Sequence, residues 1–207
     1  MMQNRFQKEM ELMDGGALCV IGVDEVGRGP LAGPVVAAAV TFSEPIESKW
    51  WEEIFDSKKL SQAKREYLFS IISEHAECSV GISSVMEIEQ LNILQASLLA
   101  MKRAVENFSG HESSVVLVDG KFIIPDLKAP QEAIVKGDSM VHSIAASSII
   151  AKVVRDRMMD ELEIQFPEYG FAQHKGYGTK HHIEAIKKFG LSPMHRPSFC
   201  GKILAAR

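Results

Sequence analysis

Short runs of consecutive apolar residues recur along this chain and limit what it can fold into. Three of them are almost free of polar interruption and lie at residues 18–23, 34–42 and 114–118. Runs of this length are typical of strands that are buried on both faces of a sheet. Two weaker strand candidates lie at residues 78–83 and 132–136. The sequence therefore predicts a five-stranded sheet that needs a cover on each side.

Segments with helical periodicity alternate with these runs and can supply that cover. They lie at residues 61–76, 86–108, 139–165 and 179–189. The first half of segment 139–165 is apolar or small on almost every face, which predicts a buried helix whose charged second half reaches solvent. Residues 191–207 contain two prolines and are expected to be irregular. The order of elements predicts a single α/β domain over residues 1–207, with a mixed sheet flanked by helices.

Acidic residues stand where predicted strands end. Asp24 and Glu25 follow the first apolar run, Asp119 follows the run at 114–118, and Asp138 follows the last strand candidate. In an open α/β sheet, ligands bind at the ends of strands. Four carboxylates gathered there would repel one another without a counter-charge, and Mg²⁺ and Mn²⁺ favour such oxygen ligands. Two ions held in this way would suit phosphodiester hydrolysis.

Each of these acids also has an ordinary structural interpretation. A single Asp after a strand is usually a turn residue or a helix cap, and Asp138 is placed to cap a helix that begins at Ser139. A glycosidase-like pair of Asp24 and Glu25 is a further alternative, although adjacent strand residues face opposite ways and cannot readily flank one bond. For the same reason, we expect Glu25 to reach a shared site from beyond the end of the regular strand.

A glycine-rich turn, Gly27-Arg28-Gly29, directly follows the acidic pair. Its spacing does not match a dinucleotide-binding turn, and it lacks the Gly-Lys-Ser/Thr of a phosphate-binding loop. Glycines let the backbone approach a ligand closely, and Arg28 can meet a phosphate. The alternative is a tight hairpin with a solvated arginine.

Several longer motifs occur in a fixed order between residues 18 and 199. They are IGVDEVGRGPLAGPVVAAAV, DSKKLS, VDG, KGDSMVHSIAASSIIAKVVRD, HKGYGTKHH and MHRPSF. Together they resemble bacterial ribonuclease HII over nearly the whole chain. The related ribonuclease HIII is a poorer match, since it typically has a serine and a lysine where this chain has Val26 and Arg28. It also carries an extra N-terminal domain, for which the 17 residues before the first predicted strand are too few.

The resemblance implies a ribonuclease H-like α/β fold with a helical C-terminal segment. It implies an endoribonuclease that uses two divalent ions, Mn²⁺ or Mg²⁺, to hydrolyse the RNA strand of RNA–DNA hybrids. The same activity nicks duplex DNA 5′ of embedded ribonucleotides and leaves 3′-hydroxyl and 5′-phosphate ends. The implied catalytic and metal-binding residues are Asp24, Glu25, Asp119 and Asp138. The implied substrate-binding residues are Gly27, Arg28 and Gly29, which sense the ribose 2′-hydroxyl, and Tyr177, which stacks on the following sugar.

Three histidines and two lysines are weaker candidates. His174, His181 and His182 invite a zinc site, but they lack partners at ligand spacing, and we expect solvated or phosphate-contacting side chains. Lys58 and Lys59 are candidates for contact with a nucleic-acid backbone.

Charge is unevenly distributed along the chain. Its 23 Lys and Arg and 27 Asp and Glu give a net charge of −4, which by itself argues against a nucleic-acid partner. Residues 171–207, however, hold seven basic residues and one acid, and we expect this basic C-terminal segment to bind the substrate backbone. A non-catalytic nucleic-acid binder on the same fold is disfavoured, because four clustered acids without metals would repel phosphate.

The cysteines and the N-terminal residues indicate the cellular compartment. Cys19, Cys78 and Cys200 fit neither a disulfide framework nor a zinc site, so free thiols in a reducing compartment are expected. The N-terminal residues are charged throughout, unlike a secretory signal, and no apolar stretch has the roughly 20 residues of a membrane span. We therefore expect a cytoplasmic monomer that has no membrane partner.

Overall fold

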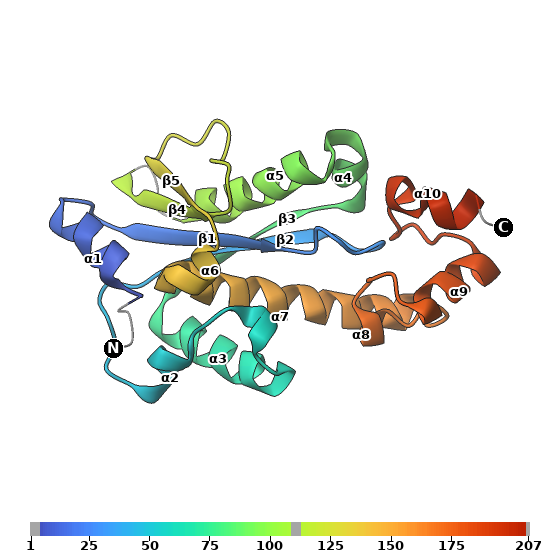
Figure 1. Ribbon diagram of the computed structural model, residues 1–207, viewed down its shortest axis with the longest axis horizontal. Helices are drawn as coiled ribbons and strands as arrows, with labels where there is room; N and C mark the ends of the chain where they lie inside the picture. The colour runs from blue at the N-terminus through green and yellow to red at the C-terminus, as the bar shows by residue number, and fades with distance from the viewer. Residues whose placement is uncertain (1–4, 109–112, 206–207) are drawn as a thin grey trace.

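A mixed five-stranded sheet runs through the middle of the protein, in the order β3-β2-β1-β4-β5 (Figure 1). The computed structural model describes residues 5–108 and 113–205. The strands are β1 (Val20–Val26), β2 (Val35–Thr41), β3 (Glu77–Ser83), β4 (Val115–Asp119) and β5 (Gln131–Ile134). The pairs β1–β2 and β2–β3 are antiparallel, whereas β1–β4 and β4–β5 are parallel. The predicted mixed sheet is confirmed, and β1 is its central strand.

Helices cover both faces of this sheet (Figure 1). One face carries α5 (Ile93–Glu106), which follows α4 (Val85–Leu91), and the other carries α7 (His142–Gln165), which packs in turn against α3 (Gln62–His75). The other helical elements are α1 (Gln7–Asp14), α2 (Lys49–Glu53), η1 (Ser57–Lys59), α6 (Gly137–Met140), α8 (Phe171–His174), α9 (Lys180–Phe189) and α10 (Pro197–Ala205). The last three form the predicted helical C-terminal segment, beyond one end of the sheet.

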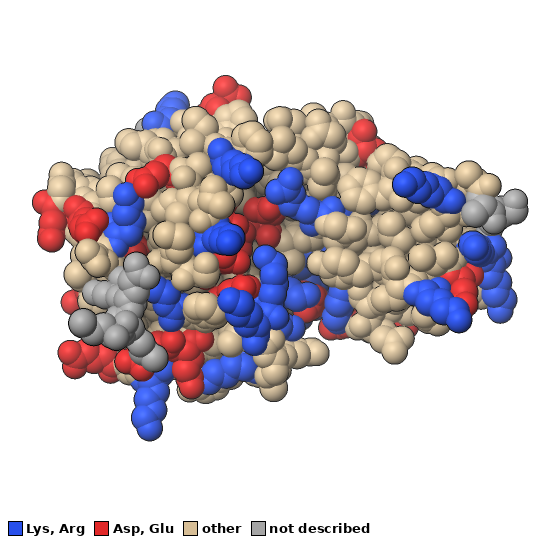
Figure 2. All heavy atoms as spheres, viewed as in Figure 1, with Lys and Arg blue, Asp and Glu red and all other residues tan. Residues whose placement is uncertain are grey.

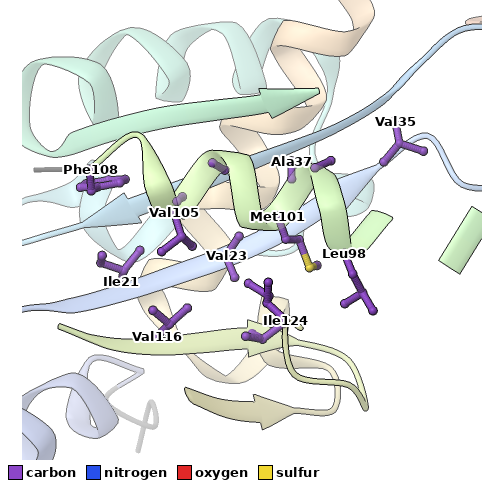
Figure 3. Packing of buried hydrophobic residues seen from close by; sticks show 14 of the residues in the cluster. Ile21, Val23, Val35, Ala37, Leu98, Met101, Val105, Phe108, Val116 and Ile124 are labelled. Atoms are coloured by element: carbon purple, nitrogen blue, oxygen red, sulfur yellow. The ribbon is translucent and has the colours of Figure 1, made fainter. Parts of the chain in front are cut away.

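Apolar side chains on both faces of the central strands explain the double cover. Val23 of β1 packs with Met101 and Val105 of α5 in one buried cluster (Figure 3). Val40 of β2 packs with Ile149 of α7 in a second cluster on the opposite face. These strands therefore have no solvent-facing side over most of their length, which is why they appear in the sequence as continuous apolar runs.

The contact between β1 and α7 is close. At Gly22 of β1, a side chain would overlap the backbone of Ser143 and Ile144, so glycine allows the first turn of α7 to lie directly against the strand. This contact places the start of α7, and α6 just before it, beside the strand that carries Asp24.

The first turn of α7 is also held by α1, a helix that the sequence analysis did not predict. Glu9 of α1 is buried, and its Oε1 accepts hydrogen bonds of 2.8 Å from the N–H and from the hydroxyl of Ser143. The N-cap residue of α7, Val141, makes no side-chain capping bond. Glu9 therefore caps the N-terminus of α7, although it belongs to another helix.

Replacing Glu9 with alanine should lower the free energy of unfolding by about 1–3 kcal/mol, because two buried hydrogen bonds at a helix N-terminus are lost. Glu11→Ala is the matched control, since Glu11 lies on the same helix and is exposed. Urea denaturation followed by circular dichroism measures both variants. Equal unfolding midpoints for the two would contradict the capping role.

Two predicted helices are interrupted in the structure. The helix predicted at 86–108 breaks at Asn92, which has a φ of 71° and whose Oδ1 accepts hydrogen bonds from the N–H groups of Leu94 and Gln95 at the start of α5. The helix predicted at 139–165 is preceded by the separate turn α6, because Val141 adopts an extended backbone between α6 and α7.

The expectation of an irregular tail over residues 191–207 was wrong in part. α10 begins at Pro197, the first helical position, where the missing N–H of proline would have had no partner in any case. α2 was also not predicted.

The three cysteines are free thiols, as expected. No helix within the described residues combines the length and the apolar composition that crossing a bilayer would need.

Candidate active site

The four acidic candidates lie on three neighbouring elements. Asp24 and Glu25 are in β1, beyond the point at which β4 stops pairing with it. Asp119 is the last residue of β4, and Asp138 lies in α6, shortly after β5. The structure therefore brings together the four residues at the strand ends of the parallel half of the sheet.

Two details differ from expectation. Glu25 lies within the regular strand, opposite Ala37 of β2, because β2 continues to pair with β1 after the apolar run has ended. Asp138 is inside α6 and does not cap the long helix, which begins at His142.

Backbone hydrogen bonds orient two of the carboxylates. Asp119 Oδ1 accepts a bond of 2.7 Å from the N–H of Gly137, which ties the end of β4 to α6. Asp24 Oδ1 accepts a bond of 2.7 Å from the N–H of Glu25. Both acceptors are therefore fixed by the main chain.

Burial and mutual repulsion raise the pKa values of three of these groups. Asp24 is only 5% exposed, and its pKa is raised well above the usual value by burial first and then by the charges of Glu25 and Asp119. Burial also raises the pKa of Glu25, and burial followed by the charge of Asp138 raises that of Asp119. The four carboxylates thus form one electrostatic cluster.

Two basic side chains, Lys58 and Arg28, contact this cluster. Lys58 Nζ lies 3.6 Å from Asp138 Oδ2, and although burial opposes it, the charges of Asp24 and Asp138 raise the pKa of Lys58. Arg28 Nη1 lies 3.2 Å from Glu25 Oε1. Figure 2 shows Asp and Glu atoms near the middle of the molecule with Lys and Arg atoms around them.

The donor chemistry of the four acids fits hard divalent cations. Carboxylate oxygens are the ligands that Mg²⁺ and Mn²⁺ prefer, and a bound cation would relieve the repulsion within the cluster. In the part of the chain that the structure describes, no three His, Cys, Asp or Glu side chains are grouped closely enough to hold a metal ion. Two of the carboxylates, Glu25 and Asp138, contact Arg28 and Lys58 respectively.

The connection between β1 and β2, residues 27–34, contains the predicted glycine-rich turn and is called the glycine loop below. It lies beside Tyr177. Gly27 has a φ of 98°, a conformation that other residues rarely adopt. A Cβ atom on Gly29 would lie 3.8 Å from Cε1 of Tyr177, so the loop and the tyrosine ring are neighbours. The N–H of Leu31 donates to the carbonyl of Gly176, which joins the loop to the segment that carries Tyr177. Tyr177 as a whole residue is 44% exposed.

Two buried arginines that the sequence analysis did not select hold this loop. Arg196 donates to main-chain carbonyls between Gly27 and Gly33, and Arg155 donates to those of Ala32, Pro34 and Lys175. Their position in long motifs was the available signal, but an arginine in isolation suggests a surface residue.

The expectation that His174 and His182 are solvated was wrong, because both are buried, while His181 is exposed. Burial lowers the pKa of His182 to about 4, so it is neutral at pH 7. His174 stacks on His182, and His182 Nε2 lies 3.0 Å from Nε2 of His195.

The basic C-terminal segment is less exposed than its sequence suggests. Arg196 is fully buried, and Lys175 is ion-paired with Asp160. Lys180, Lys188 and Lys202 lie at the surface. Lys59 is also exposed and pairs with Asp56 rather than with the carboxylate cluster.

The chain is similar to proteins of one family along most of its length. The family model described as ribonuclease HII matches residues 21–202. A ribonuclease HII of Fusobacterium nucleatum is 54% identical over 189 residues, which cover 89% of this chain and 87% of that protein.

Solved structures of a ribonuclease H2 and of a ribonuclease HIII share the fold. Ribonuclease H2 from Pyrococcus horikoshii is 27% identical, with a TM-score of 0.72 over 91% of this chain and 98% of that one. Bst ribonuclease HIII, solved in complex with Mn²⁺, is 20% identical, with a TM-score of 0.71 over 99% of this chain and 74% of that one.

Proposed function

The chain belongs to the ribonuclease HII family, and on this basis we propose that the carboxylates of β1, β4 and α6 form the catalytic centre of its endoribonuclease activity. The protein hydrolyses the RNA strand of RNA–DNA hybrids. The observation that carries the assignment of the centre is the cluster of four acids, two buried and two partly buried, three of which have raised pKa values. The match to the ribonuclease HII model agrees with the expectation that ribonuclease HIII is the poorer match.

Asp24, Glu25, Asp119 and Asp138 would hold two divalent ions, Mn²⁺ or Mg²⁺. Support comes from the oxygen-only donor set and from the Mn²⁺ complex of a ribonuclease HIII with the same fold. When bound, such ions supply an activated water and a stabilised leaving 3′-oxygen. The four acids would hold and orient the ions, and Lys58, beside Asp138, would contact the substrate phosphate.

Gly27, Arg28, Gly29 and Tyr177 would recognise the ribonucleotide. Within the described residues, no group accepts a hydrogen bond from the N–H of Arg28 or Gly29, so both donors are available to a ribose 2′-hydroxyl. The neighbouring ring of Tyr177 would stack on the sugar that follows, so that the enzyme also nicks duplex DNA 5′ of an embedded ribonucleotide. The products would carry 3′-hydroxyl and 5′-phosphate ends.

We further propose that surface lysines of residues 171–207 bind the nucleic-acid backbone, that the chain acts as a single domain and a monomer, and that it works in the cytoplasm. Lys180, Lys188 and Lys202 support the first of these, because all three lie at the surface.

One assay tests the proposed function. Three duplexes are incubated with the protein in Mn²⁺ or Mg²⁺, with and without EDTA: an RNA–DNA hybrid, a DNA duplex with one ribonucleotide, and the same duplex without it. We expect cleavage of the first two, none of the third, and complete inhibition by EDTA. Extension of the nicked strand by a DNA polymerase checks for the 3′-hydroxyl. Binding without cleavage would favour a non-catalytic nucleic-acid binder, and cleavage unaffected by EDTA would refute the metal centre.

A further inference from the structure

The guanidinium of Arg196 is fully buried and bonded to the glycine loop. Its five hydrogen bonds, of 2.7 to 3.1 Å, go only to carbonyl oxygens of Gly27, Arg28, Pro30 and Gly33. Burial, followed by the charge of Arg155, lowers the pKa of Arg196 to about 9, although the charge of Glu89 opposes this shift. A buried charge is costly, and its five bonds to the loop offset much of that cost, beside the Phe199 ring, whose centroid lies 5.2 Å from Cζ.

These bonds determine which way the loop presents its donors. In a trans peptide, the N–H points away from the carbonyl of the preceding residue. Because the carbonyls of Gly27 and Arg28 point inward to Arg196, the N–H groups of Arg28 and Gly29 point away from it. Arg196 therefore turns two main-chain donors of the loop away from its own buried guanidinium, and the Tyr177 ring lies beside Gly29, one of these two residues.

The preceding residue, His195, reaches Tyr177 through a defined chain of hydrogen bonds. The N–H of Ser192 donates to His195 Nδ1, so the proton of this neutral imidazole is on Nε2 and is donated to His182 Nε2. His182 in turn donates from Nδ1 to the carbonyl of Tyr177, at 2.9 Å. Burial lowers the pKa of both histidines to about 4, which keeps this single arrangement at pH 7.

Main-chain hydrogen bonds join the two sets of contacts, which we call the first arm (Arg196 to the glycine loop) and the second arm (His195 through His182 to Tyr177). The N–H of Arg196 donates to Leu31, and the N–H of Gly33 donates to Met194, so residues 194–196 lie alongside the loop. One dipeptide thus touches both halves of the proposed recognition surface.

We propose that His195 and Arg196 are positioning residues that fix the glycine loop and Tyr177 relative to each other. The 2′-hydroxyl and the following sugar can then be recognised together. The proposal rests on the proposed function of the loop and of Tyr177. Neither positioning residue is expected to touch the substrate.

Arg196→Lys tests the first arm, because lysine keeps the charge but cannot reach the carbonyls with a planar fork. We expect kcat on the single-ribonucleotide duplex to fall by about tenfold or more, with KM within about twofold, since the loop aligns the ribonucleotide while phosphate contacts set affinity. Leu68→Ala is the control, because it truncates a fully buried residue of α3 and should lower the melting temperature without changing kcat.

His195→Ala and His195→Gln test the second arm. The amide of glutamine can donate in place of Nε2, whereas alanine leaves His182 without its donor. We expect His195→Ala to lower the ratio of single-ribonucleotide to long-hybrid cleavage about fivefold, and His195→Gln to restore most of it.

The outcomes separate this inference from the proposed function. If the wild-type protein cleaves neither substrate with Mn²⁺ or Mg²⁺, the proposed function fails. If the wild-type protein cleaves both, the inference is overturned by an Arg196→Lys variant that keeps its kcat, or by equal cleavage ratios in the two His195 variants. An unfolded Arg196→Lys variant leaves the His195 pair to decide.

Discussion

Asp24→Asn should reduce cleavage of an RNA–DNA hybrid by about a thousandfold or more, which corresponds to about 4 kcal/mol of lost transition-state stabilisation. Asp24 is the most buried of the four acids, and it interacts electrostatically with Glu25, Asp119 and Lys58. The amide removes the negative charge at the centre of the proposed metal site and keeps the shape of the side chain. Initial rates with Mn²⁺ and with Mg²⁺ measure the loss.

The same variant should fold at least as well as the wild type without metal. The folded-state pKa of Asp24 lies above its unfolded value, so this carboxyl group destabilises the folded protein at pH 7 relative to a group with an unshifted pKa. Asparagine removes that destabilisation, and we expect an equal or higher melting temperature in EDTA. Asp14→Asn, an exposed change of the same charge, is the control. Near-normal turnover would refute the assignment of Asp24, and a lower melting temperature would refute the electrostatic explanation.

Tyr177→Ala should lower cleavage at a single embedded ribonucleotide by about 30-fold, since the loss of one stacked contact costs about 2 kcal/mol. The ring of this exposed residue lies beside Gly29, while its main chain is held by His182. On a long hybrid, we expect a smaller loss, because recognition of a junction is not required there.

Tyr177→Phe provides the matched control for this prediction. It keeps the ring and removes only the hydroxyl, so both activities should stay close to the wild type. The ratio of kcat/KM on the two substrates is the relevant measurement for all three proteins. A Tyr177→Ala variant that loses both activities equally would argue against a role at the junction.

The sheet and its acids could be predicted because they leave local signals. A strand buried on both faces, such as β1, is a continuous apolar run, and the acids stand out where such runs end. The end of β1 was placed too early, since its last residues, Asp24 to Val26, are held by pairing with β2 and are not apolar throughout.

The parts that were missed depend on contacts between remote segments. Glu9 is buried because Ser143 donates to it, and Arg196 is buried because a distant loop turns carbonyls toward it. A polar side chain with such partners looks like a surface residue in the sequence, and Lys175 and Arg196 were counted as surface charge for this reason. Asn92 likewise interrupts a helix whose apolar periodicity continues on both sides of it.

The bonds of Arg196 have a consequence for how the glycine loop can vary. They are made to oxygens that every amino acid possesses, so replacing Pro30 or Leu31 removes none of them. A rigid guanidinium has donors at fixed spacing, however, and adding or deleting one residue would carry the carbonyls out of its reach. Apart from Gly27 and Gly33, whose positive φ favours glycine, the property under constraint in this loop is therefore its length more than the chemistry of its side chains.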